Sequence, residues 1–283
     1  MNSFHAFLDI RESLNEAYNT EAHWKDADIQ RKMNSHQRRI AGVMSLAGGD
    51  WWVTSTTLTP SDSKITLPSD CVKPVYLEET TSGNVISINQ TDVRTRTLGR
   101  TVGSSLDAGT LEAYFEDLYL VVNKDSYSTG VTLWYEKRIP DIAFGVVATG
   151  DSTALTMESA QSPSYVDDYY NGVTVETMDP TSYYIKLSST VSDYAAATRI
   201  MTVTGTPTAA DSYGTISLLP VEAERLWIVS TILSLAAKAS SALDPKYFEY
   251  WMVEKKDEEN TLKSWLSRRA ATDSHIRMTG IGD

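Results

Sequence analysis

Hydrophobic residues recur with two different periods along the chain, one typical of helices and one typical of strands. Near the N-terminus they return every three or four positions between charged residues, which predicts two helices. The stripe of the second helix consists of Ile29, Met33, His36, Ile40 and Val43. The helical spacing returns after Pro220 and again from about Lys246 to Arg268, so two further helices are predicted there.

Between these helical ends the pattern changes to short runs rich in Thr, Val and Tyr, separated by Gly, Pro and Asp. Such runs predict strands. A first group of strands is predicted at 54–58, 64–67, 73–78, 85–88, 113–122 and 131–138. Residues 89–112 carry no strand pattern and are interpreted as a long arm. A second group of strands is predicted at 145–149, 154–157, 173–177, 183–187, 199–204 and 213–217.

Together the patterns predict an α+β fold with two domains. Residues 1–140 and 219–283 are expected to form a discontinuous helical bundle with a small antiparallel sheet and the arm. Residues 141–218 are expected to form an inserted β-sandwich or barrel, because short strands at this spacing with turn residues between them favour such folds.

Charge and cysteine content narrow the classes of function. The 283 residues carry a net charge of −12, which argues against broad binding to nucleic acid or anionic membrane, since both need a basic surface. The single cysteine, Cys71, excludes an internal disulfide and a cysteine-cluster metal site. The first residues lack a signal-peptide pattern, and no apolar run reaches the roughly 18 residues of a membrane helix. We therefore expect a protein made in the cytoplasm.

No motif predicts catalysis, a cofactor or a metal. The histidines at 5, 23, 36 and 275 share no metal-ligand spacing. Ser152 follows Gly150 and Asp151 in a weak esterase-like context, with no histidine between it and His275. Asp167 and Asp168 are adjacent, and adjacent strand residues point to opposite faces, so a shared carboxylate site is not favoured. The sequence predicts a protein that is not an enzyme.

One aromatic segment is a candidate binding surface. Asn171 and Gly172 both tolerate positive φ, which predicts a tight hairpin turn with strands on either side. Tyr169 and Tyr170 would then lie on a flanking strand. The two tyrosines and Asn171 would present a platform for a glycan or a protein, or the tyrosines would pack in the core with their hydroxyls at its rim.

The order of segments resembles the head-to-tail connector, or neck adaptor, proteins of tailed bacteriophages. The segments that carry the resemblance are 24–29 in the helical pair, Asp50-Trp51-Trp52, 65–70, 72–77, 118–120, 131–138 and 219–224. In addition, 165–216 is similar to a β module of phage structural proteins. The arm at 89–112 and the insertion depart from compact adaptors, which leaves the outer surface and its partners open.

The resemblance implies a virion protein of the neck region, made in the host cytoplasm, with no membrane association. Its copies would form a ring, commonly dodecameric, between the portal protein and the tail or next neck protein. DNA would pass through the lumen without specific binding, because an acidic ring repels phosphates. A mobile C-terminal tail would contact the portal through Arg268, Arg269, His275, Arg277 and Met278. The alternative is a phage surface module whose Tyr-rich β domain recognises a glycan or host receptor.

Overall fold

The computed structural model describes residues 1–15, 24–47, 51–89, 111–116, 119–124, 126–158, 163–237 and 245–279; for residues 89, 245 and 270–279 it describes the backbone only. The chain divides into two compact units. Unit 1 comprises Met1–Gly49 and Ile139–Asp283, and unit 2 is the continuous segment Asp50–Arg138 between them.

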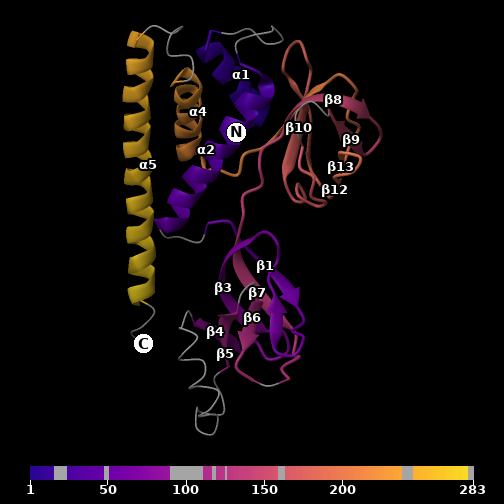
Figure 1. Cartoon of the computed structure of the whole chain (residues 1–283), viewed down its shortest axis with the longest axis vertical. Helices are drawn as coiled ribbons and strands as arrows, with labels where there is room; N and C mark the ends of the chain where they lie inside the picture. The colour runs from indigo at the N-terminus through magenta and orange to yellow at the C-terminus, as the bar shows by residue number, and fades with distance from the viewer. Residues whose placement is uncertain are drawn as a thin grey trace. The chain divides into compact units, whose positions relative to one another are not determined.

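The described helices all belong to unit 1. They are α1 (Ser3–Ser13), α2 (Asp26–Leu46), α4 (Val221–Ala236) and α5 (Pro245–Thr279). The long α5 runs beside α4, and α2 crosses the same layer (Figure 1). α4 is apolar on nearly all sides and almost fully buried, as expected for a helix that has other elements around it. It is the centre of the helical layer.

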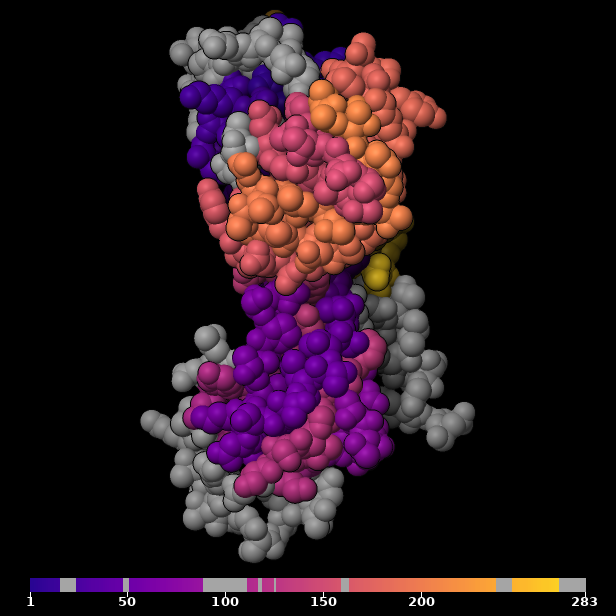
Figure 2. All heavy atoms as spheres, turned by 90° about the vertical axis from the view of Figure 1, so that its right-hand side faces the viewer, coloured from indigo at the N-terminus to yellow at the C-terminus, as the bar shows by residue number. Residues whose placement is uncertain are grey.

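Unit 1 also contains a seven-stranded antiparallel sheet in the order β11-β10-β14-β8-β9-β13-β12. Its strands are β8 (Phe144–Gly150), β9 (Ala154–Met157), β10 (Thr174–Met178), β11 (Ile185–Thr190), β12 (Asp193–Ala195), β13 (Ile200–Thr202) and β14 (Ser212–Thr215). Figure 2 shows residues of β8 and β9 next to those of β13 and β14 on one face. Buried Tyr170, Tyr194 and Tyr213 fill the core of this sheet with aliphatic side chains around them.

Unit 2 is a second seven-stranded sheet with its own core, in the order β1-β7-β3-β4-β5-β6-β2. Its strands are β1 (Val53–Leu58), β2 (Lys64–Thr66), β3 (Cys71–Glu79), β4 (Val85–Asn89), β5 (Glu112–Glu116), β6 (Tyr119–Val122) and β7 (Val131–Lys137). Only β4 and β5 pair in parallel among these described strands. That pairing joins two smaller antiparallel groups into one sheet.

The predicted fold class is therefore wrong. The protein is mostly β, with two large seven-stranded sheets and four helices in the described residues, rather than a helical bundle with a small sheet. The physical reason lies in unit 2. Its short strands each show a local period, but the β4–β5 pairing that fuses them joins segments far apart in sequence, which no local pattern records.

Many single elements agree with the sequence pattern, and four differ. The two N-terminal helices and the helices after Pro220 and near Lys246 are confirmed. The strand predicted at 113–122 is two paired strands, β5 and β6, and the strand β12 was not predicted. The predicted strand ending at Tyr170 is a turn. The tail 270–283 was expected to be extended or mobile, but α5 continues to Thr279, because no proline or glycine interrupts the helix before that residue.

Two further predictions, the arm and the domain boundaries, remain predictions. Most of the predicted arm, residues 90–110, lies outside the described residues. The domain boundaries 1–140 with 219–283 and 141–218 stay a prediction, beside the division into two units given above.

Candidate functional site

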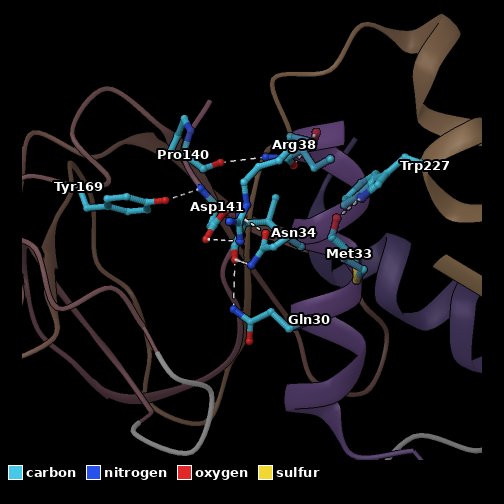
Figure 3. A network of polar contacts seen from close by, with 11 residues as sticks. Gln30, Met33, Asn34, Arg38, Pro140, Asp141, Tyr169 and Trp227 are labelled. Carbon is cyan, nitrogen blue, oxygen red and sulfur yellow. Dashed lines mark hydrogen bonds and ion pairs between the residues drawn. The ribbon is translucent and has the colours of Figure 1, made fainter. Parts of the chain in front are cut away.

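A row of buried polar side chains on α2 fastens the chain where it returns from unit 2. Gln30, Asn34 and Gln37 follow the helical spacing i, i+4, i+7, so they share one face. The side-chain amide of Asn34 accepts from the N–H of Ile142 at 2.8 Å and donates to its carbonyl at 3.3 Å. Gln30 donates to the same carbonyl, and Gln37 donates to that of Pro140 at 2.8 Å (Figure 3). These bonds satisfy main-chain groups just before β8 begins.

Asp141, between Pro140 and Ile142, contacts both α2 and the turn that carries Tyr169. Its carboxylate forms an ion pair with Arg38 of α2, with 3.0 Å between Nε and Oδ1, and its Oδ2 accepts a hydrogen bond from Nη2 of Arg38 at 3.3 Å. Its backbone N–H donates to the hydroxyl of Tyr169 at 3.0 Å. The segment 140–142 is thus held between α2 and the turn that carries Tyr169 (Figure 3). These hydrogen bonds and the ion pair fix the position of the chain at this junction.

Behind this face, α2 is held by α4. The indole N–H of Trp227 donates to the carbonyl of Met33 at 2.8 Å, and the Trp227 side chain has no exposed surface (Figure 3). The predicted apolar stripe of α2 is only partly right: His36 is half-buried and Val43 exposed, whereas Gln37 and Met44 are buried. Polar residues occupy part of this buried face, because their side-chain amides bind the returning chain.

α1 is anchored on the sheet through Asn2. Its side-chain oxygen accepts from the N–H of Phe4 at 2.8 Å and caps the helix, while its amide donates to Glu176 at 2.7 Å. The same amide donates to the carbonyl of Gly214 in β14. Phe7 stacks on Phe144 of β8 with ring centroids 4.5 Å apart. Helix and sheet in unit 1 therefore share one core.

The predicted aromatic platform lies in the turn just before β10, and Tyr170 belongs to the core of the unit 1 sheet. Tyr170 is buried, with its ring edge-on to those of Tyr169 and Tyr194. Burial and the neighbouring tyrosines raise the pKa of Tyr170. Asn171 is half-buried and donates to the carboxylate of Asp168, whose φ of 62° helps to close the turn. The exposed tyrosines of this region are instead Tyr165 and Tyr184.

The predicted portal-contact residues lie at the end of α5. Arg268 and Arg269 are exposed, one bonded to the carbonyl of Ser264 and the other over the ring of Trp265. His275, Arg277 and Met278 lie on the helix backbone, and their side chains are outside the described residues. The last buried side chain described on α5 is that of Leu266.

The acidic pair in the β-rich part does not converge on one site. Asp167 accepts from the N–H of Ala196 at 2.8 Å, whereas Asp168 accepts from Asn171 at 2.7 Å. Each carboxylate thus shapes a turn. In the described ranges no group of three or more His, Cys, Asp or Glu side chains could hold a metal ion.

Two exposed rows of side chains were not predicted from the sequence, which placed Val43 on the apolar stripe of the second helix. The α2 row consists of Arg39, Val43 and Leu46, and the α5 row consists of Tyr250, Val253 and Asp257. Both lie on the outer faces of helices whose inner faces are buried. A helical projection of each segment would have found them, because each places two apolar residues opposite the residues that anchor the helix.

His36 gives unit 1 a dependence on pH. Burial lowers its pKa from 6.5 to about 4, and Lys32, Arg39 and Lys255 of α5 add to the shift. An unfolded chain would bind this proton near pH 6.5, so the contribution is complete above pH 6.5 and is lost as pH falls towards 4. For a partly exposed group we expect a screened effect of about 1 kcal/mol.

His36→Gln should therefore flatten the loss of stability between pH 7 and pH 4.5. Urea unfolding of both proteins at the two pH values measures the difference. An unchanged difference between the two pH values would contradict the assignment.

No family model matches the chain, and no curated protein sequence matches it. Among the described helices, none is long and apolar enough to cross a membrane.

Proposed function

We propose that the chain is a structural subunit of a tailed-phage virion and not an enzyme: a head-to-tail adaptor that forms a ring between portal and tail. The observation that carries the proposal is the pair of exposed apolar rows on α2 and α5. Both helices have closed inner faces, so the rows add nothing to the core of the subunit. We take exposed apolar side chains that share one helix face as a candidate surface for association with another protein. The order of sequence segments shared with neck adaptors supports the same assignment.

The charge of the chain suits a ring around DNA. At −12, the subunit repels phosphates, so a DNA molecule can pass through a lumen of such copies without being bound. The buried polar anchor on α2 suits a static part, because it fixes the returning chain through bonds to the main chain. These features suit a rigid connecting part of a virion better than a catalytic one.

The end of α5 is the proposed contact with the portal. Beyond Leu266 the helix continues to Thr279, and its described side chains there, through Arg269, are exposed. Arg268 and Arg269 give this end a positive charge on an otherwise acidic protein. His275, Arg277 and Met278 would extend the same contact. An acidic portal surface is the partner that fits.

The alternative, a surface module that recognises a glycan or host receptor, has less support. Tyr170 was one of the three residues of its platform, and this side chain is buried. In the adaptor proposal the β8–β14 sheet is a part of the subunit that α1 fastens to the helices.

Charge reversal at the end of α5 tests the proposal. Arg268→Glu with Arg269→Glu should leave folding intact and abolish co-sedimentation with portal rings of the source phage. Lys256→Glu with Lys263→Glu is the matched control, because it makes the same charge change at exposed positions of the same helix. If unaltered protein does not bind portal rings, the adaptor assignment is wrong. If only the control pair abolishes binding, the contact lies elsewhere on α5.

A further inference from the structure

We propose that the α2 row of one copy binds the α5 row of the next copy, head to tail. This inference rests on the proposed function, since it names the contact that would build the ring. The occupant of each row is a second copy of this chain.

The two rows have matching exposure. On α2, Val43 is 49% exposed and Leu46 is 89% exposed; on α5, Tyr250 is 54% exposed and Val253 is 62% exposed. The apolar surface of such exposed leucine and tyrosine side chains is removed from water only when another surface covers it. Each row ends in an exposed charged residue, Arg39 in the first and Asp257 in the second.

The two rows also have matching spacing. Arg39, Val43 and Leu46 follow i, i+4, i+7, while Tyr250, Val253 and Asp257 follow i, i+3, i+7. Each row therefore spans two helical turns, or about 10 Å at 1.5 Å per residue. Both lie on a single helix face, so two such faces can pack along their length.

Chemistry selects the antiparallel orientation. Along α2 the order is charge, apolar, apolar, whereas along α5 it is apolar, apolar, charge. Antiparallel packing places Leu46 against Tyr250 and Val43 against Val253. It also places Arg39 beside Asp257, opposite charges at the rim of an apolar contact. Parallel packing would put each charge on an apolar side chain, which costs desolvation without a partner.

The rows face different neighbours because they lie at different places in unit 1. The first turns of α5 lie at the top of the helical layer, and the last turns of α2 lie lower, beside the later part of α5 (Figure 1). A contact between two different patches is heterologous, and repeating it gives a ring if the rotation closes. Two unlike rows on one subunit are what such an assembly needs.

Disulfide trapping tests the pairing directly. The chain has one cysteine, Cys71, whose pKa burial and Asp70 raise to about 11, and Cys71→Ser removes it from the reaction. In that background, the double variant Val43→Cys with Val253→Cys should give a ladder of covalent oligomers on oxidation. The oxidation is run under two conditions: on the free protein at high concentration, and on the protein bound to portal rings. Each single cysteine variant should give no covalent oligomers, because residue 43 meets residue 253 of another copy and never residue 43. Dimers of a single variant, or no ladder in the double variant under either condition, would overturn the pairing.

Blocking variants supply the second measurement. Leu46→Asp and Tyr250→Asp should each fail to form the assembly that the unaltered chain forms. A mixture of the two variants should stop at one-to-one dimers, because each variant retains the row that the other has lost. Tyr184→Asp, an exposed tyrosine outside both rows, is the control and should assemble fully. Light scattering reads the masses, and circular dichroism checks folding. Full assembly of either blocking variant would refute the contact.

The two proposals fail separately. A ladder without binding to portal rings would keep the contact between copies and reject the adaptor function. Binding to portal rings without a ladder would keep the function and reject the rows as the contact.

Discussion

Trp227→Ala is expected to lower the free energy of unfolding by about 3–5 kcal/mol. The side chain is fully buried at the centre of the helical layer, so truncation leaves a cavity that the helices around it can close only in part. It also removes the indole donor to the carbonyl of Met33. Urea unfolding followed by far-UV circular dichroism measures the loss without relying on the removed fluorophore.

Trp227→Phe separates packing from the hydrogen bond. Phenylalanine keeps most of the buried area, and the Met33 carbonyl still lies within the bonding pattern of α2. This variant should lose clearly less stability than the alanine variant. A loss below about 1 kcal/mol in Trp227→Ala would show that α4 is not the centre of the layer.

Gly214→Ala is expected to destabilise unit 1 by about 2–3 kcal/mol. An added Cβ would collide with the Asn2 side-chain oxygen and lie 2.7 Å from the N–H nitrogen of Phe4. Those two atoms form the cap of α1, so the clash meets backbone and cap rather than a flexible side chain. We expect a lower midpoint of thermal unfolding and faster amide exchange in α1.

Gly42→Ala is the matched control. Nothing lies within 4 Å of the added Cβ, and the residue is inside α2. Alanine there should stabilise the helix by about 0.5–1 kcal/mol. Opposite signs for the same chemical change would tie the effect at Gly214 to the docking of α1. Equal effects would contradict this account.

The sequence predicts the elements of this fold better than their arrangement. Helical spacing located α2 because an amphipathic helix shows its period locally, whereas α4 was located by Pro220 and the apolar residues after it. Strand β7 was also found from a local period, since Val131, Leu133 and Tyr135 face the core alternately. Which strands pair is a different matter. The parallel pairing of β4 with β5 joins strands on either side of residues 90–110, and nothing in either strand encodes its partner.

The anchor on α2 was missed because its residues are polar. Gln30, Asn34 and Gln37 read as part of a solvated face, and only the returning chain explains their burial. The one available signal was that their spacing continues the buried stripe. Tyr170 shows the opposite case: its flanking turn residues were visible in the sequence, whereas its place in the core depends on Tyr194, far along the chain.

The anchor also bears on how such a protein can change over evolution. Asn34 and Gln37 bind main-chain atoms of Ile142 and Pro140, so they recognise the path of the chain more than the identity of the residues on it. Unit 2 enters and leaves as one continuous segment. A lineage can therefore exchange Asp50–Arg138 for an unrelated fold and still fasten the returning strand on α2. Recombination at these two crossings would replace unit 2 while keeping the helices and the sheet of unit 1.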